Sequence, residues 1–169
     1  FNQLSFGIRY VDVRILQRVN NEEGRFWTNH GAYIFRPLLN DTALVREFIS
    51  RTNEIVIFDI HGLDGMNEAS DSHEELQTLL FNEFSLFMAP ENLTWEVTLG
   101  QLWAMNKRLI VTYNDARQVG VPYLWTAVDH QWGNVNTVDA LKNYLQGVMD
   151  SASAGKLEFP WSAMAELTP

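Results

Sequence analysis

Short apolar segments typical of β-strands alternate with segments of helical periodicity along almost the whole chain of 169 residues. Continuous apolar runs and period-two alternation mark the strands, and apolar residues three and four apart mark the helices. Strands are expected at 7–15, 26–29, 55–58, 109–113, 123–126 and 157–161, and helices at about 40–51, 72–84, 98–105 and 137–151. Strands that alternate with helices pair in parallel through right-handed crossovers. The sequence therefore predicts an α/β fold with about six strands.

This alternation fits two architectures, a doubly wound sheet and part of a (β/α)8 barrel. A complete barrel needs about 250 residues, so a barrel built from this chain would be missing its ends. The chain begins at Phe1 rather than Met and ends on Pro169, which indicates a piece of a longer protein. It has no repeat, Gly/Ser linker or low-complexity stretch, so we expect residues 1–169 to form a single domain.

The composition excludes several classes of function. A formal net charge of −9, without any basic cluster, repels phosphate backbones, so we expect no nucleic-acid partner. The absence of Cys removes disulfides, thiol nucleophiles and cysteine-bound zinc. No run approaches the roughly 18 apolar residues of a membrane span. Sequons at Asn40 and Asn92 favour an extracellular location over a cytoplasmic one, but only weakly.

Polar residues stand near the ends of four expected strands, where a packed core would not select them. Ligands bind at the carboxyl ends of parallel strands in both architectures. Asp12 and Arg14 are two residues apart on one strand, so their side chains share a face. The four groups are Asp12-Val13-Arg14, Asn29-His30-Gly31, Asp59-Ile60-His61 and Asn114-Asp115. We expect these groups to form one site.

These residue types suit an anionic, phosphate-bearing substrate. Asp12 and Arg14 can form a charge-assisted pair that leaves part of the guanidinium facing an anion. His30 is a candidate general acid or base near neutral pH. Asp59 ends an apolar strand, where a buried carboxylate is costly without a role. His61 is either a second base or a partner of Asp59.

Structural interpretations of the same residues stay open. The Asp12–Arg14 pair could be an ion pair of the fold, and His30 could be a turn residue. His73 falls in the first turn of an expected helix, where we expect it to be solvated. His130 falls in a loop, with no strand to place it.

Six segments follow one another in the order of a known family. They read GIRYVDVR at 7–14, FWTNHG at 26–31, EIVIFD at 54–59, TLGQLW at 98–103, RLIVTY at 108–113 and LTP at 167–169. They resemble the X domain of phosphatidylinositol-specific phospholipase C, above all the small X domain-containing proteins and the bacterial enzymes. The resemblance implies an irregular (β/α)8 TIM barrel, of which this chain is an incomplete piece covering about strands two to seven.

The resemblance also implies a two-histidine reaction. One histidine of the family deprotonates the inositol 2-hydroxyl, which attacks phosphorus, and the other protonates the departing diacylglycerol oxygen. His30 matches the second of these, and Asp12 and Arg14 match the acidic-x-basic pair of the metal-independent members. These three residues are therefore the expected catalytic set. The expected substrate-binding or supporting residues are Asp59, His61, Tyr113 and Asp115.

Arg14 bears on the question of a metal. The calcium-dependent enzymes of the family carry an acidic residue at this position. In those enzymes calcium stabilises the negative charge of the phosphorane, which the arginine stabilises in the metal-independent members. Asp59 matches a metal-binding acid of those enzymes, but its companion is replaced by Arg14. A metal ion could also be bound by Asp12, Asp59, His30 and His61. The positive charge of Arg14 beside these residues opposes the binding of a cation. We expect neither a metal nor a cofactor.

The first histidine of the family lies in a Ser-His-Asp stretch that would precede this chain, and none of His61, His73 and His130 matches it. The leading hypothesis is a phosphoric diester hydrolase that cleaves phosphatidylinositol or a related phospholipid by general acid–base catalysis, with peripheral membrane contact. One alternative is an inactive X-domain protein that binds lipid or carbohydrate. Another is a glycerophosphodiesterase or sphingomyelinase D-like enzyme. Those enzymes bind magnesium through a Glu-x-Asp pair, and Arg14 does not fit that pattern.

Overall fold

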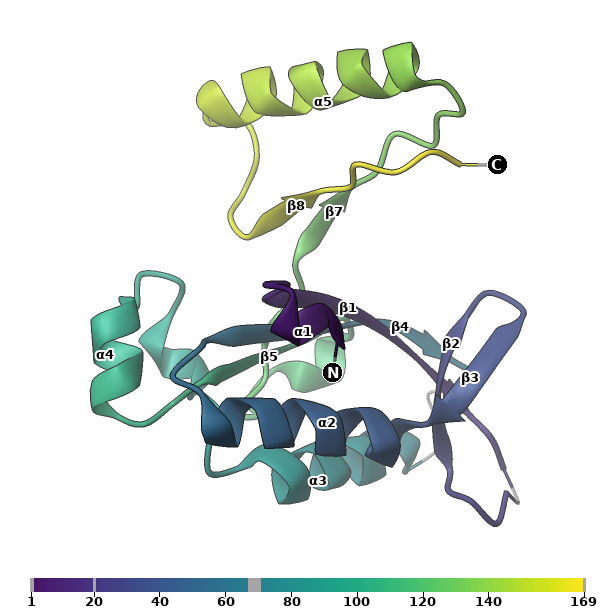
Figure 1. Ribbon diagram of the computed structural model, residues 1–169, viewed down its shortest axis with the longest axis vertical. Helices are drawn as coiled ribbons and strands as arrows, with labels where there is room; N and C mark the ends of the chain where they lie inside the picture. Colours follow the sequence, from purple (N-terminus) through teal and green to yellow (C-terminus); the bar gives the residue numbers. More distant parts are fainter. Residues whose placement is uncertain (1, 20, 67–70, 169) are drawn as a thin grey trace. The chain divides into compact units, whose positions relative to one another are not determined.

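A computed structural model describes residues 2–19, 21–66 and 71–168 (Figure 1). The chain divides into two compact units, Phe1–Ala127 and Val128–Pro169, which we describe separately. The terminal residues Phe1 and Pro169, used above to infer a piece of a longer protein, lie outside the described residues. The expectation of a single domain over residues 1–169 stays a prediction.

The first unit contains a six-stranded sheet with the order β3-β2-β1-β4-β5-β6. Its bounds are β1 Tyr10–Gln17, β2 Phe26–His30, β3 Tyr33–Pro37, β4 Val56–Asp64, β5 Leu109–Tyr113 and β6 Trp125–Thr126. The strands β1, β4, β5 and β6 pair in parallel, which confirms the predicted mixed α/β class. The order of the strands is linear, and the closed barrel stays a prediction.

The strand expected at 26–29 does not pair in parallel. As β2, it pairs antiparallel with β1 and forms a hairpin with β3, a strand that the sequence pattern did not predict. The physical reason is the short connection at 18–25, because strands joined without a crossover helix pair antiparallel. His30 ends β2 and therefore does not belong to the row of parallel carboxyl ends.

The helices of the first unit are α1 Asn2–Ser5, α2 Leu38–Arg51, α3 Ser72–Phe84 and α4 Leu99–Ala104, with short 3-10 turns η1 Glu91–Leu93 and η2 Ala116–Gln118. In α4, the Thr98 hydroxyl accepts from the Gln101 backbone N–H, and the Gln101 side chain accepts from the Thr98 N–H. This capping box explains why the helix begins there. The sequence placed the start of α2 two residues too late, inside its first turn.

The two faces of the sheet carry different side chains. One face packs its Val, Ile and Phe residues against α2 and α3, which lie together on that side in Figure 1. This core contains Val13, Ile15, Phe58, Ile60, Val111, Phe48, Leu76, Leu80 and Phe84. The opposite face contributes Ile110 and Trp125 to a smaller core with Leu102 of α4. The alternation of apolar and polar residues in β1 thus has the predicted orientation.

The second unit consists of α5 Val138–Ser153 and a parallel pair of short strands, β7 Asp129–Gln131 and β8 Trp161–Ala163. The last strand therefore lies C-terminal to the position expected at 157–161. The Thr137 hydroxyl caps α5 by accepting from the Ala140 N–H. His130 lies on β7, not in the loop that we expected.

None of the helices in the described ranges is both long and apolar enough to cross a membrane. Asn40 lies on α2 and Asn92 in η1, and both are exposed. Exposure satisfies the steric requirement for a sequon to be modified. The extracellular location stays a prediction.

Candidate active site

A row of polar residues crosses three neighbouring strands of the sheet. Asp12 of β1 is the register partner of Asp59 of β4, and Asp59 is the partner of Thr112 of β5. Partners in adjacent parallel strands point to the same face, about 4.8 Å apart. The row therefore lies on the face opposite the core under α2 and α3. Asp12 and Asp59 lie inside their strands and not at the strand ends that we expected, because β1 continues to Gln17 and β4 to Asp64.

Asp59 is fully buried, and hydroxyl groups from both neighbouring strands hold its carboxylate. The Tyr10 hydroxyl donates to Asp59 Oδ2 at 2.5 Å. The Thr112 hydroxyl donates to Asp59 Oδ1. A carboxylate that accepts a hydrogen bond on each oxygen has a fixed orientation.

Asp12 and Arg14 form the expected pair on one face of β1. Arg14 Nη2 lies 3.4 Å from Asp12 Oδ2. Asp12 Oδ1 and Arg14 Nε are buried atoms that lack a hydrogen-bond partner within the described residues. Gly62, the register partner of Arg14, makes room for this side chain, because a Cβ at Gly62 would lie 3.2 Å from Arg14 Cβ and Cγ. The pair therefore has one buried acceptor and one buried donor that a bound ligand could satisfy.

A cavity of about 450 Å³ lies along the edge of β1. It exists because β2 pairs with β1 only over Ile15–Gln17 and leaves residues 10–14 uncovered on that side, as far as the described strands extend. The residues that line it are Gln3, Leu4, Val11, Asp12, Val13, Arg14, Thr28, Asn29, Phe35, Arg36, Asp41, Leu44, Val45 and Phe58. The site pair therefore borders a cavity that has both apolar and charged walls.

His30 does not line this cavity. It is exposed at the end of β2, where its register partner is Tyr33 of β3. The neighbouring Asn29 lines the cavity in its place; it is buried, and its Nδ2 donates to Asp64 Oδ2 at 2.6 Å. The structure thus places Asp12 and Arg14 together at the cavity, and His30 is not among the residues that line it.

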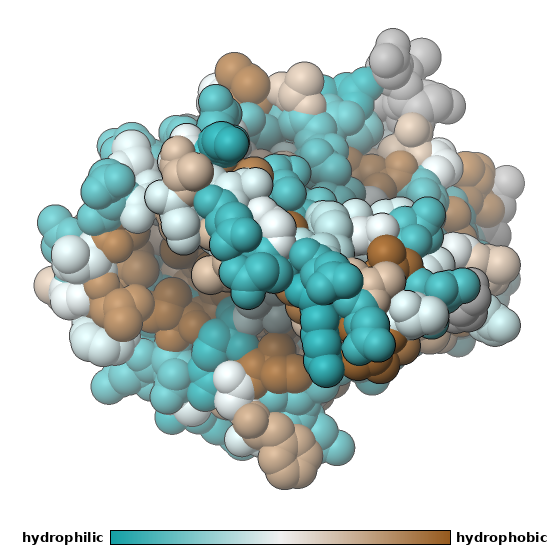
Figure 2. Space-filling model, turned by 90° about the horizontal axis from the view of Figure 1, so that it is seen from above, coloured by the Kyte–Doolittle hydropathy of each residue, from teal (hydrophilic) through white to brown (hydrophobic). Residues whose placement is uncertain are grey.

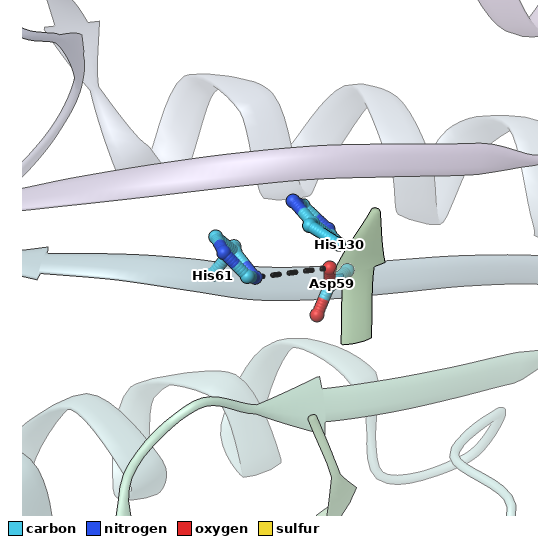
Figure 3. A group of neighbouring side chains, drawn as sticks. All are labelled: Asp59, His61 and His130. Carbon is cyan, nitrogen blue, oxygen red and sulfur yellow. Dashed lines mark ion pairs between the residues drawn. The ribbon is translucent and has the colours of Figure 1, made fainter. Parts of the chain in front are cut away.

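His61 joins Asp59 on β4, as Figure 3 shows. Its Nδ1 lies 3.7 Å from Asp59 Oδ2, the distance of an ion pair rather than of a hydrogen bond. The register runs from Val13–Ile60 directly to Arg14–Gly62, so His61 is the extra residue of a β-bulge. Asp59 and His61 are two residues apart on β4, and the alternation of a strand puts such side chains on one face.

Tyr113 and Asp115 lie apart from this row. Tyr113 is fully buried in the core under α2 and α3, and its hydroxyl lies 2.7 Å from Nδ1 of His73. Arg117 Nη1 lies 2.8 Å from His73 Nε2 and donates to both oxygens of Asp115. His73 is only 3% exposed, so the expectation that it is solvated was wrong.

This second cluster has shifted proton affinities. Burial first, and then the Arg117 cation, lower the pKa of His73, and the Asp115 charge opposes the shift. Burial, followed by the Asp115 charge, raises the pKa of the Tyr113 hydroxyl, and Arg117 opposes it. Both groups are therefore neutral near pH 7, which suits a structural connection between α3 and the segment after β5.

Sequence reasoning missed Tyr10 and Thr112, and it named Asn29 only as a member of the group Asn29-His30-Gly31. Alternation in β1 puts Tyr10 on the face of Asp12, and Thr112 is the one hydroxyl residue inside the apolar run 109–112. Both signals were present in the sequence. The position of Asn29 depends on the antiparallel hairpin, which local periodicity does not reveal.

Comparison with known proteins gave curated relatives of one kind. The chain is 32% identical over 159 residues to PI-PLC X domain-containing protein 1 of Homo sapiens, which covers 92% of the chain and 47% of the relative. It is 28% identical over 146 residues to the protein of the same name in Danio rerio, covering 86% of the chain and 46% of the relative. PI-PLC X domain-containing protein 3 of Mus musculus is 28% identical over 154 residues, with 85% of the chain and 45% of the relative covered.

The chain thus spans about half the length of the curated relatives that it matches. No family model matches it. No solved structure gives a significant match. The matches cover most of the chain, including the segments that resembled the X domain. The resemblance is thereby confirmed, and the chain is a homologue of the PI-PLC X domain-containing proteins.

Proposed function

We propose that the protein is a phosphodiesterase that cleaves phosphatidylinositol or a related phospholipid without a metal ion. The observation that carries the proposal is the Asp12–Arg14 pair, which lies on one face of β1 beside a cavity and keeps a buried acceptor and donor unused. Buried polar atoms without partners cost about 1–3 kcal/mol each. Such a cost is expected where a ligand supplies the missing partner.

In this proposal, Arg14 stabilises the charge that develops on phosphorus. The guanidinium binds a non-bridging phosphate oxygen, and its planar array of N–H donors fits the phosphate geometry. Asp12 holds Arg14 through Oδ2 and accepts a hydroxyl of the substrate at Oδ1. Arg14 thereby does the work that a calcium ion would do with an acidic residue at its position.

His30 is the proposed general acid. As the substrate hydroxyl forms its bond to phosphorus, the bond to the diacylglycerol oxygen breaks, and that oxygen takes a proton from His30. His30 lies outside the cavity in the described structure. The proposal therefore requires that the β2–β3 hairpin carry His30 toward bound substrate.

We further propose that the first unit is part of a (β/α)8 barrel. Its parallel strands β1, β4, β5 and β6 carry α2 and α3 on one face and the polar row on the other. In a barrel, the helix-covered face is the outside and the polar row faces the interior. The two antiparallel pairings of β1, β2 and β3 make it an irregular barrel.

Membrane contact is proposed at the β2–β3 hairpin. Three consecutive apolar residues of β3, Tyr33, Ile34 and Phe35, are 75%, 45% and 62% exposed. Figure 2 shows a surface that is mostly hydrophilic and interrupted by separate hydrophobic patches. A consecutive exposed run that includes aromatic residues favours the interface of a bilayer. Insertion of this strand would bring lipid to the hairpin that carries His30.

A second candidate function is a lipid-binding protein without catalytic activity. The exposed position of His30, outside the cavity that Asp12 and Arg14 line, favours it. Such a protein would bind the phosphate headgroup through Arg14 and release it unchanged.

The test uses the full-length protein with vesicles of phosphatidylinositol in phosphatidylcholine, with excess chelator present. Phosphorus NMR follows the released inositol phosphate, and co-sedimentation measures binding. We expect turnover in chelator, and a loss of about 10²-fold or more for Arg14→Lys, because the charge stays while the planar donors are lost.

Arg46→Lys is the matched control. Arg46 lies on α2 and pairs with Glu83 at 3.0 Å, away from the polar row. This variant should keep full activity. Binding that depends on Arg14 without any turnover would identify the non-catalytic binder instead. Turnover that requires calcium would contradict the metal-independent mechanism.

A further inference from the structure

We propose that Asn29 of β2 is a specificity-determining residue, whose Oδ1 accepts a hydroxyl group of the ligand and so selects phosphate esters of a polyol. Asp64 of β4 is its positioning residue. The inference rests on the proposed function for the phosphate group at Arg14 and deepens it, because it assigns the part of the site that recognises the rest of the headgroup.

One polar atom of the Asn29 side chain is buried without a partner. Asn29 is only 4% exposed, and it lines the cavity along β1. Its Oδ1 has no hydrogen-bond partner among the described residues. Most buried polar atoms of folded proteins are hydrogen-bonded, so each exception requires a reason. A ligand in the cavity would supply the missing donor.

The contacts of Asn29 fix the orientation of its amide. Nδ2 donates to Asp64 Oδ2 at 2.6 Å and to the Gly31 carbonyl oxygen at 3.4 Å. A carboxylate and a carbonyl only accept hydrogen bonds, so a half turn of the amide would place Oδ1 against two acceptors. Neither Asp64 nor Gly31 lines the cavity. Nδ2 is therefore engaged by the fold, and Oδ1 is the atom that can bind a ligand.

The hydrogen bond to Asp64 directs Asn29 over β1. This strand lies between β2 and β4 in the sheet, so a side-chain contact from β2 to β4 passes over it. At this end, the last described pair of β1 and β2 is Ile15 with Thr28. Arg14 and Asn29 come next on the two strands, and residues opposite each other in adjacent strands share a face. Asn29 thus lies beside Arg14, on the same face of the sheet.

The cavity wall contains a second polar group, and this one is satisfied. Thr28 donates to Asp41 Oδ2 at 3.0 Å, and Arg36 forms an ion pair with Oδ1 of the same carboxylate. These residues need no ligand to complete their contacts. Among the described residues that line the cavity, the buried side-chain atoms without a partner are Asp12 Oδ1, Arg14 Nε and Asn29 Oδ1.

Two acceptors and one charged donor define the chemistry of the ligand. Arg14 donates to a phosphate oxygen, whereas Asp12 Oδ1 and Asn29 Oδ1 accept and therefore require donors from the ligand. A phosphate ester of a polyol carries the anion and several hydroxyl donors in one molecule. An ester whose alcohol has no hydroxyl group would leave Asn29 Oδ1 unpaired. Sites built to bind a hydroxyl discriminate against ligands that lack it.

The binding test compares inositol 1-phosphate with methyl phosphate, which has the ester group but no hydroxyl on its alcohol. Calorimetry on the full-length protein measures both affinities, and we expect the wild-type protein to prefer inositol 1-phosphate by at least about tenfold. Asn29→Leu should lower this preference by roughly three- to tenfold, because one hydrogen bond is lost. Its affinity for methyl phosphate should stay the same. Asn143→Leu, the same substitution at an exposed residue of α5, is the matched control.

The role of Asp64 is tested without altering Asn29. Asp64 is exposed, so Asp64→Asn should leave thermal unfolding unchanged. The new amide can donate as well as accept, so the Asn29 amide is no longer held in one orientation. The preference for inositol 1-phosphate should fall to a value between those of the wild-type protein and Asn29→Leu. An unchanged preference would overturn the positioning role.

Vesicles of phosphatidylinositol distinguish a lipid headgroup from a free phosphate ester. If the headgroup is bound as part of a lipid, Asn29→Leu should lower kcat/KM on the vesicles by the same factor as the preference. A loss with inositol 1-phosphate that does not recur on vesicles would assign Asn29 to the free ester.

The outcomes separate this proposal from the phosphodiesterase function. An Asn29→Leu variant that keeps the wild-type preference, or that loses affinity for both phosphate esters alike, overturns the role of Asn29. The phosphodiesterase then still stands if Arg14→Lys lowers turnover. A wild-type protein that shows the preference but releases no inositol phosphate from vesicles overturns the phosphodiesterase. Asn29 then remains the specificity-determining residue of a binding protein.

Discussion

The stability of the protein in mild acid should depend on His73. Arg117 can only donate hydrogen bonds, so its contact of 2.8 Å with His73 Nε2 requires an unprotonated nitrogen there. The proton of the neutral ring is then on Nδ1, which donates to the Tyr113 hydroxyl at 2.7 Å. Protonation would place an N–H against an N–H and a cation against a cation. The lowered pKa of His73, due first to burial and then to Arg117, agrees with this geometry.

The sign and size of the effect follow from linkage. The unfolded chain binds a proton at His73 near its ordinary pKa of 6.5, whereas the folded protein keeps the ring neutral. Stability is therefore complete above that pH and is lost as the pH falls below it. From about pH 7 to about pH 5.5, the loss from this one group is at most about 1 kcal/mol.

The assay is urea unfolding followed by tryptophan fluorescence, at both pH values, for the wild-type protein and His73→Phe. At pH 7 the variant should be less stable by about 1–3 kcal/mol, because the buried Tyr113 hydroxyl loses its partner. At pH 5.5 the difference should shrink by about 1 kcal/mol. His30→Phe, the same substitution at an exposed residue, should leave the pH dependence unchanged. Equal losses on acidification in the wild-type protein and in His73→Phe would refute the reasoning.

Three further predictions concern single positions. Gly62→Ala places a Cβ 3.2 Å from the Arg14 side chain, so it should lower hydrolysis by roughly tenfold, since a displacement of 1 Å costs about 10²-fold; an unchanged rate would contradict the role of Gly62. Thr98→Ala removes the capping box of α4 and should cost about 1 kcal/mol in thermal unfolding; unaltered melting would argue against the cap. Arg14→Asp should make hydrolysis respond to added calcium, whereas the wild-type rate should not; a wild-type rate that chelator abolishes would reverse this expectation.

The elements that the sequence predicted correctly are those in which burial alternates locally. Val13 and Ile15 pack in the core while Asp12 and Arg14 face the other way, as the period of two in β1 requires. The continuous apolar run of β5 likewise marks a strand that is buried on both faces. These features can be predicted because the polarity of each residue reflects the burial of its own side chain.

The features that could not be predicted depend on contacts between distant segments. The bulge at His61 follows from the register of β4 against β1, which no local pattern encodes. Tyr113 was expected at the site, but its hydroxyl pairs with His73, forty residues away in sequence, on the helix side of the sheet. His30 was placed by assuming a parallel strand, and the hairpin with β3 removed the basis for that position.

The two faces of β4 and β5 indicate why the polar row exists. On the helix side, Phe58, Ile60 and Val111 belong to the apolar core. This face of the two strands contributes to the stability of the fold through packing. On the other side, the same strands bury Asp59 and Thr112. Removing a carboxylate from water costs several kcal/mol even after relaxation, and two hydroxyl donors at about 1 kcal/mol each offset only part of that cost. Together with the ion pair to His61 at 3.7 Å, these donors hold a carboxylate on a face where packing alone would favour an apolar residue, which supports the function proposed for this face.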